Sequence, residues 1–402
     1  MNPQTLNHRL EAARPSATYT IIDRVTARRA EGATIISLCA GEPDFDTPEH
    51  IRAAAINAIH QGHTRYTQVA GLRALREAIA RKYQRENGLA VGWQDTLVCS
   101  GGKQVIYNAL AATLNEGDEV IIPAPYWVSY PEMVQLCGGE SRIVTCGAAS
   151  AFKLTPSQLA EAIGPKTRWV ILNSPSNPTG AVYTRQELKA LADVLLLHPH
   201  VMILADDIYE HLIFDGLAFV TLAQVEPRLG ARTLTMNGVS KAYAMTGWRI
   251  GFATGPRWLL NAMEKLQGQQ TSGACSISQH AAIAALDGPK GFITKSRAVF
   301  ERRRDFVVEQ LNKAPGLRCE RPQGAFYAFV DCSALLGKHS PGGLSLADDT
   351  AVARALLEEA NSAVVPGSAF GLPGYLRMAY ALDDHSLLTA CEAIRQFCEN
   401  TR

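Results

Sequence analysis

The sequence lacks the marks of several large protein classes. Its 402 residues carry a formal net charge of +1 and contain no block of like charge, so no nucleic-acid footprint is expected. No apolar run is long enough to cross a bilayer, and residues 1–10 lack the apolar core of a signal peptide. The early strand-to-helix turns show no Gly-x-Gly-x-x-Gly fingerprint, which disfavours a dinucleotide-binding dehydrogenase. Neither nucleic acid nor a membrane is therefore expected as a partner.

Cysteine pairing is also missing. The chain has nine cysteines, an odd number, and no Cys-x-x-Cys pair. Scattered cysteines of this kind are typical of reduced thiols, so the sequence predicts a cytoplasmic protein without disulfides or structural zinc. The run His198-Pro-His200 has metal-capable side chains, but it lies between a helical pattern and a strand pattern and is interpreted as a loop. No metal site is predicted.

What is present is a large α/β pattern. The chain is 47% hydrophobic, and apolar strand patterns alternate with helical ones from about residue 50 to residue 290. This alternation predicts a mostly parallel, doubly wound sheet. Strand patterns at residues 324–331 and 375–381 predict a smaller α/β domain. We therefore expect three parts: an N-terminal arm joining the small domain (1–47), a large domain (48–295) and a small C-terminal domain (296–402).

The run at residues 237–251, NGVSKAYAMTGWRIG, is the most informative stretch. It places Lys241 directly after Ser240 and eight residues before Arg249. A lysine can bind an aldehyde as an imine, while a hydroxyl and a planar guanidinium can hold a phosphate dianion. Together they indicate pyridoxal phosphate, which needs a lysine and a carboxylate for its pyridinium nitrogen. Taken alone, a Ser-Lys dipeptide is more often a solvated surface pair, so the hypothesis depends on the rest of the chain.

Two buried-strand patterns end on the polar groups that such a cofactor needs. The pattern at residues 201–206 ends on Asp206, with Tyr209 three residues later. Ligands of parallel α/β sheets bind at the carboxyl ends of strands, so Asp206 is a candidate partner for the ring nitrogen and Tyr209 for the ring hydroxyl. The pattern at residues 169–173 leads into a rigid turn of prolines and glycine that holds the amide of Asn177, a candidate donor to the same ring oxygen. The alternatives are a helix N-cap for Asp206 and a simple turn around Asn177.

A glycine turn offers a further phosphate contact. Gly101 and Gly102 lie between a strand pattern at residues 96–99 and a helical pattern that begins near Lys103. Backbone N–H groups at such a turn face an anion at the positive end of the helix dipole. Trp127 follows the next strand pattern and is the candidate for stacking on a cofactor ring, with a core or interface tryptophan as the alternative.

Together these segments resemble one family. From about residue 14 to the C-terminus, the sequence is similar to the class I, fold-type I pyridoxal-phosphate aminotransferases, and among these to the bacterial branch of aspartate and prephenate aminotransferases. The matching segments lie in order at residues 14–18, 40–48, 64–66, 100–104, 123–130, 173–180, 206–209, 237–251 and 376–377. One departure is mild, since Asp207 stands where the family often has glutamate. The resemblance implies a fold-type I transferase with a large domain and a smaller α/β domain.

The resemblance also implies a role for each site residue. Lys241 would be the catalytic lysine that binds the cofactor, and a homodimer with shared active sites would bring Tyr66 of one subunit to the phosphate bound by the other. The remaining cofactor-binding residues would be Gly101, Gly102, Lys103, Trp127, Asn177, Asp206, Tyr209, Ser240 and Arg249. The substrate-binding residues would be Thr18, Gly41, Lys103, Trp127, Asn177 and Arg377.

These roles imply a reaction. Arg377 and the backbone N–H of Gly41 would bind the α-carboxylate of an amino acid, and the Lys241 amine, kept neutral by its cationic neighbours, would take the proton from the α-carbon. Lys103 and Thr18 are candidates for the distal carboxylate of an acidic substrate; a solvated lysine and a simple helix start are the alternatives. Aspartate or glutamate with oxaloacetate or 2-oxoglutarate are therefore favoured in a ping-pong reaction. Prephenate remains open as an additional acceptor.

Two other readings share most of these residues. A carbon–sulfur lyase or another fold-type I enzyme would keep the cofactor and change the reaction, and it would consume its donor without a 2-oxo acid. A pyridoxal-phosphate-sensing regulator would carry an additional DNA-binding domain, which we do not expect because the resemblance begins near residue 14 and runs to the last residue.

Overall fold

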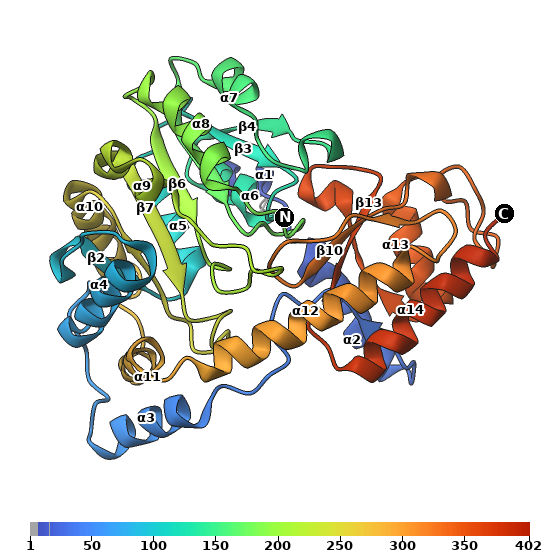
Figure 1. Cartoon of the computed structure of the whole chain (residues 1–402), viewed down its shortest axis with the longest axis horizontal. Helices are drawn as coiled ribbons and strands as arrows, with labels where there is room; N and C mark the ends of the chain where they lie inside the picture. The colour runs from blue at the N-terminus through green and yellow to red at the C-terminus, as the bar shows by residue number, and fades with distance from the viewer. Residues whose placement is uncertain (1–6, 16) are drawn as a thin grey trace, which may run out of the picture.

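The computed structural model describes residues 7–15 and 17–402 (Figure 1). Its main feature is a seven-stranded sheet in which six strands share one direction. The strands are, in sheet order, β2 (Thr96–Cys99), β8 (Gly251–Thr254), β7 (Thr233–Gly238), β6 (Met202–Asp206), β5 (Thr167–Asn173), β3 (Glu119–Ala124) and β4 (Glu140–Thr145). Only β8 runs antiparallel to its neighbours within this sheet. The predicted mostly parallel sheet is confirmed.

Helices cover both faces of this sheet. Along β5 the side chains of Trp169 and Ile171 enter one core cluster, while those of Val170 and Leu172 enter another on the opposite face. A strand covered on both sides needs apolar residues at every position, which explains the nearly continuous apolar runs of β5 and β6. The first face carries α5 (Gly102–Ala111), α6 (Ser129–Leu136) and α10 (Arg257–Gly268). The second carries α3 (Glu49–His60), α4 (Arg73–Asn87), α7 (Pro156–Ala162), α8 (Arg185–Leu196), α9 (Leu222–Val225) and α11 (Ser276–Asp287).

A second region is built around a four-stranded antiparallel sheet. Its strands, in sheet order, are β12 (Val365–Pro366), β13 (Tyr375–Ala379), β10 (Tyr327–Asp331) and β9 (Arg318–Cys319). Helices α13 (Asp349–Glu359) and α14 (Asp384–Glu399) contribute to its core. Strand β10 begins three residues later than the pattern at 324–331 predicts, because Ala325 adopts a left-handed φ of 59° that a strand cannot contain.

The N-terminal part of the chain joins this second region. Strand β1 (Ile36–Ser37) pairs in parallel with β11 (Ser362–Ala363), and α2 (Ala17–Ala30), which follows the short α1 (His8–Ala12), packs near β12. The long helix α12 (Gly291–Leu311), orange in Figure 1, runs from the side of α11 to α14. It passes through the expected boundary at residue 296, so the division of the chain into three parts stays a proposal.

Local signals in the sequence determine where several helices begin. The Thr184 hydroxyl accepts a bond from the N–H of Glu187, and the Glu187 carboxylate accepts one from the N–H of Thr184, which forms a capping box at the start of α8. Asp383 caps α14 through the N–H of Ser386. None of the helices in residues 7–15 and 17–402 combines the length and the apolar composition needed to span a membrane.

Candidate active site

The carboxyl ends of the parallel strands border a cavity of about 660 Å³. Asp206 lies at the end of β6, and Lys241 follows the end of β7, so the large sheet supplies one wall. Arg377 on β13 and Thr18 on α2 line it from the second region. Of the predicted site residues, all except Gly101 and Tyr66 line this cavity.

The amine of Lys241 lies in the lining of this cavity. The Nζ atom of Lys241 donates to the carbonyl oxygen of Gly41 at 2.5 Å and lies 5.9 Å from the centre of the Tyr209 ring. Removal from water lowers the pKa of Lys241 to about 8; Glu42 opposes this shift, and the positive charge of Arg249 adds to it. A neutral amine is therefore accessible near physiological pH, as a nucleophile or a base requires.

Asp206 is a buried carboxylate with room for another donor. Its Oδ2 accepts from the Tyr130 hydroxyl at 2.5 Å, and its Oδ1 accepts from the N–H of Ile208 at 3.3 Å. Burial raises the pKa of Asp206 to about 6, while the bonds from Tyr130 and Ile208 and the charge of Lys241 act in the opposite direction. A cation placed against this carboxylate would hold it ionised.

A cradle for an anion lies at the start of α5. Gly101 has a φ of 86°, and a Cβ atom there would lie 2.1 Å from a guanidinium nitrogen of Arg249. A Cβ on Gly251 would lie 2.3 Å from the backbone nitrogen of Gly102. Only glycine leaves space for the backbone N–H groups and the arginine to converge on the helix terminus, with Ser240 close by in the cavity wall. The predicted phosphate contacts are therefore brought together, and Gly101 acts through the shape of this cradle.

Arg377 is a buried cation in need of an anion. Its side chain is 2% exposed, lies between the rings of Tyr327 and Phe370, and donates to the Cys39 carbonyl and the Asn177 side-chain oxygen at 2.7 and 3.1 Å. Its Nε has no hydrogen-bond partner, and no carboxylate in the described residues forms an ion pair with it. Leaving a buried charge unpaired is costly, so a carboxylate ligand fits this place.

The ring-binding groups face the same space. The Tyr209 hydroxyl shares a hydrogen bond of 2.8 Å with Tyr327, and the Lys103 ammonium lies 5.0 Å from the centre of the Trp127 ring. Burial lowers the pKa of Lys103, and the nearby charge of Arg249 lowers it further. The positive charge of Lys103 would be stabilised by a carboxylate of a ligand, in addition to the carboxylate that fits at Arg377.

These observations test whether the cavity fits pyridoxal phosphate. The group needs an amine for its aldehyde, an anion for its ring nitrogen, donors for its ring oxygen and a cradle for its phosphate. Lys241, Asp206, Asn177 with Tyr209, and the glycine turn with Arg249 offer one of each around one cavity. The residues present fit the group.

Tyr66 lies outside the cavity. Its side chain is 95% exposed, on the loop between α3 and α4. An isolated chain gives this tyrosine no contact with the site, so its predicted role toward a second subunit stays a prediction.

Sequence reasoning assigned no role to several residues that line the cavity, among them Tyr130 and Tyr327. Tyr130 bonds to Asp206, which lies 76 residues further along the chain, and Tyr327 bonds to Tyr209. Tyr130 belongs to one of the matching segments, three residues after Trp127. That spacing at a helix start was the one signal that could have pointed to it.

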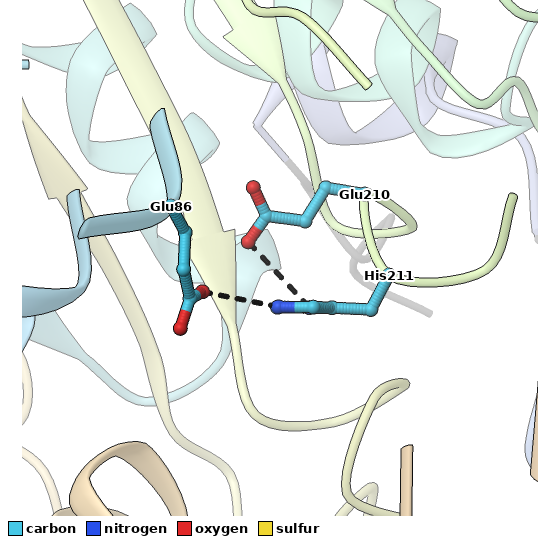
Figure 2. Close-up of side chains that lie close together, drawn as sticks. All are labelled: Glu86, Glu210 and His211. Carbon is cyan, nitrogen blue, oxygen red and sulfur yellow. Dashed lines mark hydrogen bonds and ion pairs between the residues drawn. The ribbon is translucent and has the colours of Figure 1, made fainter. Parts of the chain in front are cut away.

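A second cluster of charges lies outside the cavity lining. Figure 2 shows His211 between Glu86 and Glu210, with nitrogen-to-oxygen distances of 3.0 and 3.5 Å. Lys82 of α4 forms an ion pair with Glu210 and lies 3.8 Å from Glu86. Burial raises the pKa of Glu86, but its bond to His211 and the charge of Lys82 outweigh this and hold the pKa at about 2. The Lys82 ammonium therefore already provides the cation that these carboxylates need. The cluster ties α4 to the segment that carries Tyr209.

Comparison with known proteins agrees with this geometry. The family model described as aminotransferase class I and II matches residues 33–394. The chain is 55% identical over 393 residues to the aspartate/prephenate aminotransferase of Cereibacter sphaeroides, covering 98% of each chain. It is 54% identical over 389 residues to a probable aspartate/prephenate aminotransferase of Rhizobium leguminosarum bv. phaseoli, covering 97% of each.

Solved structures show the same fold. The aspartate aminotransferase of Rhizobium meliloti superposes with a TM-score of 0.97 at 50% identity, covering 99% of this chain and 100% of that one. The aspartate aminotransferase of Thermus thermophilus with maleate gives a TM-score of 0.92 at 41% identity, over 98% and 100% of the two chains. The predicted fold-type I architecture is confirmed. A family model that spans most of the chain, and relatives of this identity over nearly their whole length, establish that this protein belongs to the class I and II aminotransferases.

Proposed function

We propose that this aminotransferase binds pyridoxal 5'-phosphate in the cavity and moves an amino group between aspartate or glutamate and a 2-oxo acid such as oxaloacetate or 2-oxoglutarate. Prephenate is proposed as an additional acceptor. The observation that carries the proposal is the convergence of the Lys241 amine, the Asp206 carboxylate and the unpaired Arg377 guanidinium on one cavity. The names of the relatives, which include both aspartate and prephenate, support this choice of substrates.

Each cofactor contact is assigned to a group in the cavity. When bound, pyridoxal phosphate supplies an aldehyde that takes up the amino group and a pyridinium ring that withdraws electrons. Asp206 would hold the ring nitrogen, Asn177 and Tyr209 would hold the ring oxygen, and Trp127 would pack against the ring. Gly102, Ser240 and Arg249 would bind the phosphate, Gly101 would shape the turn that they share, and Lys103 lies beside them.

Lys241 is the group that moves a proton. Its Nζ accepts the proton removed from the α-carbon of the amino acid, which needs an amine whose pKa lies below that of an ordinary lysine. The hydrogen bond from Nζ of Lys241 to the Gly41 carbonyl holds the amine in position at the cavity wall. Because the 2-oxo acid product must leave before the acceptor enters the same cavity, we expect ping-pong kinetics.

Two cations bind the two carboxylates of an acidic substrate. Arg377 holds the α-carboxylate together with the N–H of Gly41, and Lys103 with Thr18 receives the distal carboxylate. The cavity is long enough to be lined by Thr18 on α2 and by Arg249 near the phosphate cradle. The aspartate aminotransferase of Thermus thermophilus was solved with maleate, a dicarboxylate, which supports a site with two anion contacts.

We infer a homodimer in which Tyr66 of each chain reaches the other subunit's phosphate, because an exposed tyrosine next to a helix with two half-exposed isoleucines, Ile56 and Ile59, suits a partner surface. A cytoplasmic location agrees with nine free cysteines.

Lys103→Gln tests the substrate assignment. Pre-steady-state spectroscopy of the yellow enzyme would follow the reaction with aspartate, glutamate, alanine, phenylalanine and cystathionine, and prephenate or 2-oxoglutarate would restore the starting spectrum. Losing a charged contact costs roughly 1.5–3 kcal/mol, so kcat/KM for aspartate and glutamate should fall about 10- to 100-fold, with alanine and phenylalanine little changed.

The same measurement separates the alternatives. Equal losses for acidic and neutral donors would remove Lys103 from the distal-carboxylate site. Consumption of cystathionine without any 2-oxo acid would indicate lyase chemistry. Lys313→Gln is the matched control, because Lys313 lies just after the end of α12, and among the described contacts its side chain forms an ion pair with Glu309 alone.

A further inference from the structure

Tyr130 connects two walls of the cavity. It lies in the first turn of α6 with 2% of its side chain exposed. Its ring packs edge-on against Trp127, with ring centroids 5.4 Å apart and planes at 89°. Its hydroxyl donates to Oδ2 of Asp206 at 2.5 Å. One side chain therefore contacts both the proposed stacking ring and the proposed partner of the ring nitrogen.

The hydroxyl leaves the carboxylate able to accept more. An ionised carboxylate offers about four lone-pair positions. In the part of the chain that the structure describes, Tyr130 and the N–H of Ile208 are its hydrogen-bond donors, so positions on both oxygens stay free. Burial raises the pKa of Tyr130 well above its ordinary value, and the charge of Asp206 adds to this, so the phenol keeps its proton and remains a donor.

Asp206 needs such a donor. A carboxylate at 3% exposure is pushed toward its neutral form by desolvation, and a neutral acid makes a weaker partner for a ring N–H. A phenol that donates to the carboxylate stabilises the ionised form and also restricts its rotation. No other side-chain hydroxyl or amide in the described residues donates to this carboxylate.

We propose that Tyr130 is a positioning residue for the cofactor, which holds Asp206 ionised and aimed at the ring nitrogen while its ring supports Trp127. This inference rests on the proposed binding of pyridoxal phosphate in the cavity. It predicts that removing the Tyr130 hydroxyl weakens the contact between Asp206 and the ring nitrogen and leaves the phosphate contacts intact.

The test compares two ligands of the cofactor-free protein, read by quenching of tryptophan fluorescence. One ligand is pyridoxal phosphate, and the other is its analogue with the ring nitrogen replaced by carbon, which gives Asp206 nothing to receive. Tyr130→Phe should raise the dissociation constant of pyridoxal phosphate about tenfold, the value of one charge-assisted hydrogen bond, and leave that of the analogue unchanged. In the Asp206→Asn background, Tyr130→Phe should have no further effect.

Tyr183→Phe is the matched control. Tyr183 is also buried, and its hydroxyl accepts from the N–H of Leu154 at 2.8 Å; it does not line the cavity that holds Asp206. It should lose one buried hydroxyl without changing the ratio of the two dissociation constants.

Each other outcome overturns a stated claim. Equal weakening of both ligands by Tyr130→Phe would show a merely structural role, and no weakening would show no role. Failure of the unaltered protein to bind pyridoxal phosphate would instead overturn the proposed function, without reference to any variant. Should Tyr130→Phe not fold, 3-fluorotyrosine at position 130 keeps the ring and gives a stronger donor, and an unchanged ratio of dissociation constants would then refute the inference.

Discussion

Lys241 is the residue whose environment most clearly sets its chemistry. Desolvation in the cavity wall lowers its pKa to about 8, although Glu42 opposes the shift. The amine therefore gains its proton only below about pH 8, whereas an ordinary lysine holds it up to about pH 10.4. In the cofactor-free protein, the rate at which an amine reagent modifies Lys241 should rise with pH and level off above about pH 8, as read by peptide mass spectrometry.

Surface lysines in the same digest provide the comparison. Their modification rates should still be increasing at pH 9, because their amines are mostly protonated there. A Lys241 profile that rises in parallel with theirs would mean that the cavity does not lower its pKa.

At the scale of single residues, the sequence placed most of the site and missed part of it. Asp206 and Asn177 were predictable because each lies at or just after the end of a buried strand, and strand ends of a parallel sheet meet at one edge. Lys241 was predictable from its spacing to Ser240 and Arg249. Tyr130 and Tyr327 were not, since a tyrosine in an apolar segment looks like a core residue until the direction of its hydroxyl is known.

Helix α4 is tied to the active-site segment by a buried ion pair. Lys82 and Glu210 are 1% and 3% exposed in their side chains and face each other, and Asn87 donates to the other Glu210 oxygen at 2.8 Å. Removing one partner of such a pair leaves an uncompensated buried charge, so Lys82→Met should lower the free energy of unfolding by about 3–5 kcal/mol. Urea unfolding of the cofactor-free protein at fixed concentration measures this.

The exposed pair of Glu309 in α12 and Lys313 just after its end gives the comparison. Both side chains are at least half exposed, so Lys313→Met should cost no more than about 1 kcal/mol. A similar small effect for Lys82→Met would show that Glu210 finds another partner. Recovery of stability when Glu210→Leu is added to Lys82→Met would support the pairing.

At the scale of elements, periodic segments were predicted well. The strand predicted at residues 201–206 corresponds to β6, and the strand predicted at residues 169–173 corresponds to most of β5. Strands β1, β11 and β12 contain two residues each and carry no periodicity that could reveal them. The antiparallel entry of β8 between β2 and β7 was also not predictable, because strand order follows from long-range pairing and not from local pattern.

For the whole molecule, the proposed homodimer makes a strong prediction. Light scattering should give a mass about twice 43.5 kDa. Tyr66→Ala should weaken pyridoxal phosphate binding about 10- to 100-fold, since a bond to a charged phosphate is lost. Mixing Tyr66→Ala chains with Lys241→Ala chains should restore tight binding at one site per dimer, where an intact Lys241 meets an intact Tyr66.

Two results would contradict the shared site. A monomeric mass would remove the partner, and a mixture that binds no better than the Tyr66→Ala parent would show that Tyr66 serves its own chain. Reassembly after mild denaturation ensures that chains exchange before the measurement.

The convergence of cations on the cavity has an effect beyond any single contact. Lys103, Lys241, Arg249 and Arg377 line it, against the carboxylates of Glu42 and Asp206. A chain with a net charge of only +1 therefore presents a local excess of positive charge in this cavity at the strand ends. Low-dielectric walls concentrate such a field, so a dianion is drawn inward before it touches the protein, and salt weakens that attraction. Near-neutrality of the whole chain and a strong pull on small anions coexist because the charges are sorted in space.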